Sequence, residues 1–189
     1  MANKVCIIES DKIVDGTNLM KGNTDLVKWD SDLSSLTNGY MMFVVCSNLT
    51  SFSSDLSSLT NGYMMFVNCE NLTSFSSDLS SLTNGHYMFA GCKKLTSFDS
   101  DLNSLTNGEH MFTDCKLNAE SLKKIAISLP KTDISGTRMT ISLEADSHDN
   151  GDGTQTPDDI KICYDLVLIS YKGWELYNFG DLYWGIGRY

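Results

Sequence analysis

The feature that most constrains this chain is a segment that repeats every 23 residues. Residues 53–75 read SSDLSSLTNGYMMFVNCENLTSF, and residues 76–98 read SSDLSSLTNGHYMFAGCKKLTSF. A fixed period of this length is typical of solenoids, in which each repeat forms one coil and buries its apolar side chains against neighbouring coils. The period therefore predicts a stack of coils.

The copies show which positions are constrained. Full copies begin at Ser31, Ser54, Ser77 and Ser100, and a degenerate copy precedes them in the same register. The full copies share an Asp, two Leu, a Thr-Asn-Gly triplet, a Met-Phe pair and a Cys, and Asn23 replaces the Cys in the degenerate copy. We expect the positions that vary, such as 40–41, 44–45 and 47–48, to face solvent.

Local patterns predict the path of one coil. Phe52 and Leu56 alternate with polar residues, which favours a short strand with both side chains facing inward. The Gly of the Thr-Asn-Gly triplet is expected to form a corner with positive φ. The spacing of Phe66, Cys69 and Leu72 suits a 3₁₀ or single-turn helix. One coil is therefore expected to be strand, corner, helical turn and return.

The combined pattern MFxxCxxLxSFxxDLxxLTNGxxMF resembles the BspA-like leucine-rich repeats of bacterial surface proteins and of some phage structural proteins. The resemblance covers residues 8 to about 117, and the exchange of Cys for Asn is one that leucine-rich repeats make. It implies an α/β solenoid with short strands and 3₁₀ or short helical turns. It also implies a binding or adhesive role, with no catalytic residues to carry over.

The residues after Cys115 leave the 23-residue period. Asn118 is expected to cap a helix that Pro130 ends, and Thr156 a second helix that ends at Gly173. RMTISLEA and WELYNF are predicted strands. These elements would close the open end of the stack. We therefore predict a leucine-rich repeat solenoid at 1–117, an α/β C-terminal cap at 118–178 and an aromatic tail at 179–189.

The charge and composition of the chain limit the classes of ligand that it can bind. A net charge of -10 with only 14 Lys and Arg residues argues against nucleic acid and anionic membranes as ligands. No apolar run is long enough for membrane insertion, and no signal peptide is recognisable. The location is unknown: cytoplasmic, virion-associated, or that of a fragment of a surface protein.

The sequence contains none of the patterns that indicate an enzyme. It has no phosphate loop, no nucleophile–base motif and no paired catalytic carboxylates. We therefore expect a non-enzymatic protein without a cofactor. The segment at 146–159 is similar to a calcium loop in its first half, but Pro157 stands where that loop needs a Glu. Calcium is thus a minor alternative.

Four of the six cysteines share one register: Cys46, Cys69, Cys92 and Cys115. In a stack of coils they would lie one above another at roughly strand spacing, ~4.8 Å. Reduced cysteine behaves as a small buried apolar residue, so we expect a ladder of buried thiols. A disulfide or a zinc site stays an alternative, although zinc prefers ligands gathered tetrahedrally rather than in a row. We expect no metal here.

Four aspartates form a second column: Asp32, Asp55, Asp78 and Asp101. Unit charges ~5 Å apart repel by about 0.8 kcal/mol even in bulk water. Each carboxylate could accept backbone N–H bonds in an Asx turn. Alternatively, the column binds cations or a basic partner.

Aromatic residues supply the other candidate sites. Tyr40 and Tyr63 share a register, His86 continues their row, and Tyr87 lies beside it. A protein or glycan partner would stack on this strip.

The tail is the last candidate. It is rich in large apolar residues, among them Tyr183 and Trp184, and its glycines make it a poor helix. Such a segment either folds back on the cap or docks on another chain, which would give a homo-oligomer. We predict a non-enzymatic binding protein that attaches to a host, a surface or another protein. The alternative is a virion structural or decorating component that assembles through its cap and tail.

Overall fold

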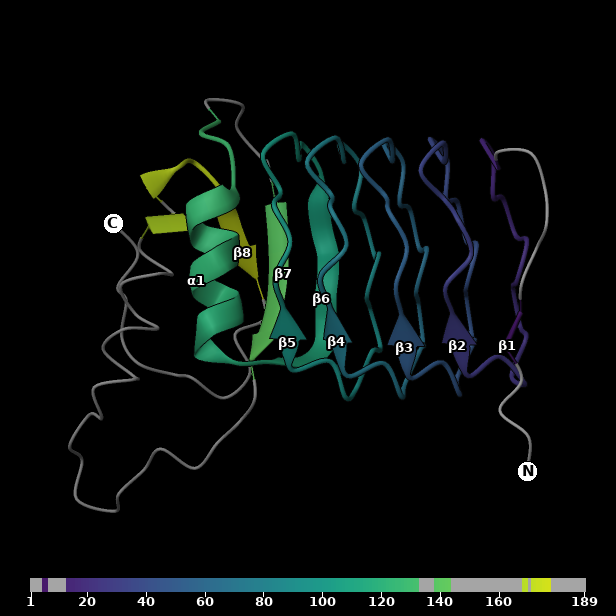
Figure 1. Ribbon diagram of the computed structural model, residues 1–189. Helices are drawn as coiled ribbons and strands as arrows, with labels where there is room; N and C mark the ends of the chain where they lie inside the picture. Colours follow the sequence, from purple (N-terminus) through teal and green to yellow (C-terminus); the bar gives the residue numbers. More distant parts are fainter. Residues whose placement is uncertain (1–4, 7–12, 133–137, 144–167, 170, 178–189) are drawn as a thin grey trace, which may run out of the picture.

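The structure is a computed structural model of the 189-residue chain, and it describes residues 5–6, 13–132, 138–143, 168–169 and 171–177. Within these residues the 23-residue copies form coils that stack side by side along one axis (Figure 1). We number them in chain order: coil 1 comprises residues 13–30, coil 2 residues 31–53, coil 3 residues 54–76, coil 4 residues 77–99 and coil 5 residues 100–117.

Short parallel strands line one side of the stack (Figure 1). They are β1 (Val5–Cys6), β2 (Lys28–Trp29), β3 (Ser51–Phe52), β4 (Ser74–Phe75) and β5 (Ser97–Phe98). The pairs keep the sequence register, with Lys28 opposite Ser51 and Ser74 opposite Ser97. In β2 to β5 the first residue is exposed and the second is buried. The prediction of a short strand with an inward Phe is therefore confirmed.

On the other side of coils 1 to 4, hydrogen-bonded β-turns replace the helical turn that the sequence predicted. In coil 3 the N–H groups of Met65, Val67 and Cys69 donate to carbonyls three residues earlier, at 3.0, 3.3 and 3.1 Å. Met64 and Asn68 lie within this series, with φ of 55° and 58°. The helical prediction was wrong because left-handed residues interrupt the right-handed path that a 3₁₀ helix requires.

The same two positions are left-handed in each described coil. The first is occupied by Asn18, Met41, Met64, Tyr87 and His110, and the second by Gly22, Val45, Asn68, Gly91 and Asp114. A regular strand alternates inward and outward side chains. Here Met65 and Phe66 are consecutive and both fully buried, while Tyr63 and Met64 before them are only half-buried. The left-handed residues therefore place side chains inward and outward in pairs.

The glycines of the Thr-Asn-Gly triplets are not positive-φ corners, so that prediction was wrong. They are buried, and they leave room for a methionine of the next coil. A Cβ at Gly62 would lie 2.8 Å from Met88 Sδ and 3.1 Å from Leu82 Cδ1. The same crowding by methionine is found at Gly16, Gly39, Gly85 and Gly108. Close packing rather than backbone conformation requires glycine here.

The core is built from columns of identical side chains. Phe66 lies parallel to Phe89 with ring centroids 5.4 Å apart. Phe75, from β4, meets Phe89 edge-on at 4.8 Å. Aromatic pairs favour offset-stacked and edge-to-face arrangements of this kind. Each coil thus packs its two phenylalanines against those of its neighbours.

The four ladder cysteines are buried free thiols, as the sequence predicted. The Sγ of Cys69 donates to the carbonyl of Phe43 at 3.2 Å, and that of Cys92 to the carbonyl of Phe66 at 3.2 Å. Burial raises the pKa of the Cys46 thiol to about 11, and burial also raises the pKa values of the other three thiols. Because the thiolate is the reactive species, these cysteines are chemically protected.

We expect the ladder cysteines to resist alkylation in the native protein. Iodoacetamide at mildly alkaline pH should leave Cys46, Cys69, Cys92 and Cys115 unmodified, as assigned by peptide mass spectrometry, because the thiols are both shielded and protonated. The same reagent should label all four in denaturant. Rapid native labelling, or recovery of a Cys46–Cys69 disulfide, would contradict the buried ladder.

Longer elements continue the stack beyond coil 5. Helix α1 (Ala119–Ser128) begins behind Asn118, whose side-chain oxygen accepts the N–H of Ser121 at 2.9 Å. The helix lies beside β5 (Figure 1), and the N–H of Phe98 donates to the Ser121 hydroxyl at 2.8 Å. Ser121 follows Phe98 by one 23-residue period. The helix therefore occupies the place of the next strand.

The opposite side of the stack continues as a parallel sheet of β6 (Gly108–Leu117), β7 (Arg138–Leu143) and β8 (Glu175–Tyr177), in that order (Figure 1). The predictions of α1 and of strands near 138 and 174 are confirmed. Strand β6 was missed, because its sequence follows the coil pattern. The predicted helix that starts at Thr156 falls largely outside the described residues.

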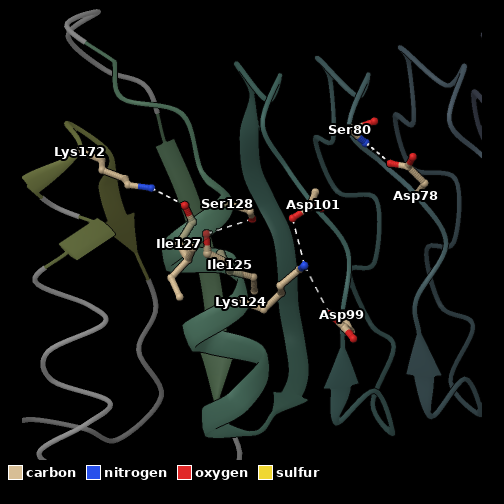
Figure 2. A network of polar contacts seen from close by, with 9 residues as sticks. All are labelled: Asp78, Ser80, Asp99, Asp101, Lys124, Ile125, Ile127, Ser128 and Lys172. Carbon is tan, nitrogen blue, oxygen red and sulfur yellow. Dashed lines mark hydrogen bonds and ion pairs between the residues drawn. The ribbon is translucent and has the colours of Figure 1, made fainter.

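Residues near β8 hold the C-terminal end of α1. The Nζ of Lys172 donates to the carbonyl of Ile127 at 2.7 Å (Figure 2). It also donates to the carbonyl of Leu129 at 2.6 Å. A cation at this end of a helix is favourable because the last carbonyls lack partners within the helix. Gly173 has a φ of 90°, as predicted for a C-cap.

Candidate functional site

The variable positions of the coils gather on one side of the stack, which we call the aromatic face. It consists of Tyr40, Met41, Tyr63, Met64, His86, Tyr87, Glu109 and His110, and each of these residues is half-buried. The paired outward placement arises from the left-handed residues at positions 41, 64, 87 and 110. Two neighbouring columns of side chains therefore reach solvent together.

The rings of the aromatic face form a row along the stack axis. Tyr40 and Tyr63 are stacked with centroids 5.1 Å apart and planes within 6°. His86 follows Tyr63 at 5.5 Å. The shared register of Tyr40, Tyr63 and His86 predicted this row, and Tyr87 lies beside it as expected. Because Tyr63 has a ring on each side, a ligand meets its ring edge and hydroxyl group rather than an open ring face.

Histidines make the other end of the row ionisable. Tyr87 lies between His86 and His110, 4.5 Å from each ring. Burial lowers the pKa of His86, and the Glu109 carboxylate opposes that shift. The face thus changes from Tyr and Met in coils 2 and 3 to ionisable groups in coils 4 and 5. His110 was missed in the sequence because its equivalents at the first left-handed position are mostly not aromatic.

The aspartate column is largely engaged within the protein. The carboxylates of Asp32, Asp55 and Asp78 accept the backbone N–H two residues ahead, at 2.9, 2.8 and 2.8 Å. Figure 2 shows this contact between Asp78 and Ser80. These are the Asx turns that formed one of the two alternatives. Cation binding by the column stays a prediction.

Asp101 differs from the rest of its column. Lys124 of α1 reaches it at 3.0 Å and also approaches Asp99 at 3.5 Å (Figure 2). The hydrogen bond to Asp101 is the main cause that raises the pKa of Lys124. Lys124 follows Asp101 by one period, so the helix adds a cation to the end of the acidic column. This partner comes from outside the repeat pattern, which is why the sequence did not reveal it.

An asparagine ladder was also missed. The Nδ2 of Asn61 donates to the Oδ1 of Asn38 at 2.9 Å, and that of Asn84 to the Oδ1 of Asn61 at 3.1 Å. Each of these oxygens also accepts the N–H two residues ahead, such as that of Tyr63 at 3.2 Å. The ladder could have been predicted from the sequence, because every Thr-Asn-Gly triplet has its Asn at the same position of the repeat. The ladder thereby positions the residue that follows each triplet, which is Tyr40, Tyr63, His86 or Glu109.

Other candidates fall outside the described residues. They are Tyr183, Trp184, the rest of the tail at 179–189 and the calcium-like segment at 146–159. Among the residues that are described, no group of three or more His, Cys, Asp or Glu side chains is arranged to hold a metal ion. In the same residues no helix has the length and apolar character needed to cross a membrane.

Comparison with known families accounts for the repeat. The family model of the BspA type leucine-rich repeat region, with 6 copies, matches residues 23–134, more than half of the chain. The match extends past residue 117, where the sequence pattern ended the repeats, and includes α1. Searches of curated proteins and of solved structures found no match. The chain belongs to the BspA-type leucine-rich repeat family.

Proposed function

We propose that this chain is a non-enzymatic binding protein that attaches to a protein or surface ligand through the aromatic face. Its family is one of binding repeats, which supports a binding role in general. The aromatic face supports the finer proposal. Its side chains are Tyr and Met in coils 2 and 3 but differ in coil 4 and again in coil 5, whereas the inward Met, Phe, Cys and Leu positions are the same in every full copy. Packing constrains the residues of the core, so the residues of the aromatic face are the ones that can determine which ligand binds.

The chemistry of the face suits a protein better than a glycan. Sugar rings stack on open aromatic faces, but the faces of Tyr40 and Tyr63 are turned toward each other. What these rings offer is apolar edge, hydroxyl groups and the neighbouring thioethers of Met41 and Met64. Tyr and Met are enriched at protein interfaces for this combination of apolar area and adaptable contact. We therefore propose a protein partner.

The elements after coil 5 have a supporting role in this proposal. α1, β7 and β8 extend both sides of the stack, and we propose that residues 118–178 act as its cap. Lys172 and Trp174 support this role, because both bond to carbonyls at the end of α1. A cap would shield the strand edges of coil 5 from other chains.

Binding to an array of peptides and oligosaccharides tests the proposal. The double variant Tyr40→Ser/Tyr63→Ser should weaken binding to the peptides that the wild type recognises by at least about tenfold, because clustered aromatic residues dominate interface energies. The control is Ser53→Ala/Ser76→Ala, which changes two exposed residues elsewhere on coils 2 and 3 and should bind like wild type.

Two outcomes would overturn the proposal. In one, the tyrosine variant binds the same peptides as tightly as the wild type. In the other, no array member binds while the chain forms a stable symmetric oligomer or co-purifies with particles, which would favour the virion structural alternative. Thermal unfolding of both variants distinguishes lost contacts from lost folding.

A further inference from the structure

The asparagine ladder changes at its last rung. Asn61 and Asn84 each donate from Nδ2 to the Asn Oδ1 of the coil before, at 2.9 and 3.1 Å. In coil 5 the Nδ2 of Asn107 lies instead 3.5 Å from the Nδ1 of His86. Coils 2 and 3 have a tyrosine at the position of His86, and a tyrosine ring has no nitrogen to accept this bond. The histidine of the aromatic row therefore takes a donor that belongs to the ladder in the earlier coils.

The other bond of Asn107 shows which atom donates in this contact. Its Oδ1 accepts the N–H of Glu109 at 3.2 Å, so its amide nitrogen is the atom that faces His86. An amide nitrogen only donates, which makes His86 Nδ1 the acceptor and places the proton of the neutral ring on Nε2. A second proton would enter at Nδ1, directly against the amide donor. The contact can therefore exist only while His86 is neutral.

A second acceptor for Asn107 Nδ2 lies within the ladder. Asn61 Oδ1 accepts two donors, the N–H of Tyr63 at 3.2 Å and the Nδ2 of Asn84 at 3.1 Å. Asn84 Oδ1 is its equivalent one coil later, and it accepts the N–H of His86 at 3.2 Å. A carbonyl oxygen of this kind has capacity for one more donor. The Asn107 amide thus has two possible acceptors, and one of them is lost when His86 is protonated.

Titratable and charged groups surround His86 on the face. They are Tyr63 of coil 3, the adjacent Tyr87, Glu109 and His110 of coil 5, and Arg138 of β7, which pairs with Glu109 at 3.5 Å. Burial lowers the pKa of His86, His110 lowers it as well, and Glu109 opposes both. A histidine with a lowered pKa is neutral near pH 7 and gains its second proton in a mildly acidic medium.

We propose that His86 is a proton switch at the coil 4–coil 5 end of the aromatic face, in which protonation moves the Asn107 amide from His86 Nδ1 to Asn84 Oδ1. In the neutral state the ladder is interrupted at its last rung. In the protonated state the ladder is complete, and the His86 ring carries a positive charge and an N–H on both nitrogens.

The consequence for binding rests on the proposed function of the aromatic face. The new charge lies beside His110, whose ring centroid is 6.0 Å from that of His86, on a chain of net charge -10. The carboxylate that acts on His86 is that of Glu109, and Arg138 already pairs with it. Protonation therefore makes this end of the face more positive, which favours partner segments that contain Asp or Glu.

Nuclear magnetic resonance of the full chain tests the switch without any ligand. The ring nitrogens of His86 and the side-chain amide of Asn107 are followed from about pH 8 to about pH 4.5. We expect the Nε2–H tautomer of His86 at the start of the titration. The amide signals of Asn107 should shift with the same midpoint as His86, because one proton displaces one donor. The side-chain amide of Asn61, which has no histidine beside it, should shift far less.

Two variants copy a residue that a neighbouring coil has at the same position. His86→Tyr introduces the equivalent of Tyr63 and should abolish the titration of the Asn107 amide. The control is His110→Tyr, which introduces the equivalent of Tyr87. It should keep that titration and move its midpoint upward, because His110 lowers the pKa of His86. Thermal unfolding checks that both variants are folded.

A peptide array probed at about pH 7.5 and about pH 5.5 tests the consequence for binding. Peptides that contain Asp or Glu should bind the wild type at least about threefold more tightly at the lower pH, as expected for an exposed ion pair. Peptides without acidic residues should show no such gain. His86→Tyr should remove most of the gain.

Three results of the titration would overturn the inference. They are a neutral His86 with its proton on Nδ1, an Asn107 amide that does not follow the His86 midpoint, and an amide titration that persists in His86→Tyr. Acidic peptides that bind equally at both pH values would overturn the link between the switch and binding. If no peptide binds at either pH, the proposed function fails, and the titration still decides whether the switch exists.

Discussion

Replacing Phe66 with alanine is expected to lower the free energy of unfolding by about 3–5 kcal/mol. The ring is fully buried at the centre of the stack and meets four others: Phe43, Phe52, Phe75 and Phe89, with centroids 4.9 to 5.5 Å away. Its removal leaves a cavity that neighbouring coils cannot close, because their own side chains are held in register above and below. Denaturant unfolding followed by circular dichroism measures the change.

The control for Phe66→Ala is Ile127→Ala. Ile127 is also a large apolar residue, but its side chain is 60% exposed on α1. The control should stay within about 0.5 kcal/mol of the wild type. A loss for Phe66→Ala that is equally small would mean that the columns of rings do not form a continuous core.

Gly173→Ala should destabilise the protein by at least about 2 kcal/mol, for two reasons that act together. Gly173 has a φ of 90°, a conformation that L side chains rarely adopt. A Cβ there would also collide with the backbone carbonyl oxygen of Thr132. That segment is held in place, because the Thr132 N–H donates to the Lys172 carbonyl at 2.8 Å. Neither Gly173 nor Thr132 can therefore move to relieve the collision.

Gly22→Ala separates the two causes. Gly22 has a φ of 74°, but a Cβ there would meet nothing within 4 Å. This control should cost only the conformational strain, about 1–2 kcal/mol. Thermal unfolding of both variants gives the comparison. An equal loss for the two variants would contradict the crowding at Gly173.

The sequence predicted the features of the fold that depend on burial and register. Identical Phe and Cys residues every 23 positions have to be stacked, and the structure stacks them. Asn118 and Pro130 marked the ends of α1 because capping chemistry is local. The turns of each coil could not be predicted in this way. Met64 and Tyr87 carry no turn signal, yet both are left-handed, because the stacked neighbours dictate the backbone path.

The candidate site was predictable to a similar extent. Tyr40 and Tyr63 share a register, and this was sufficient to predict the row that they form. His110 joins the row only because a left-handed residue turns its column outward. The repeat glycines were assigned a backbone role, since the pattern Thr-Asn-Gly is common in turns. Their actual constraint is a methionine one coil away, a contact that no local pattern contains.

The central claim is that two left-handed residues in each coil turn neighbouring side chains outward and so create the aromatic face. Val45 tests it most directly, because it is β-branched, 41% exposed and held at a φ of 61°. Such a residue is strained there, and asparagine tolerates that conformation. The decisive measurement is the free energy of unfolding of Val45→Asn beside that of Val44→Asn, whose half-buried residue is not left-handed. We predict that Val45→Asn gains about 0.5–1 kcal/mol while Val44→Asn loses stability. Equal losses in both variants would contradict the left-handed path of the coils.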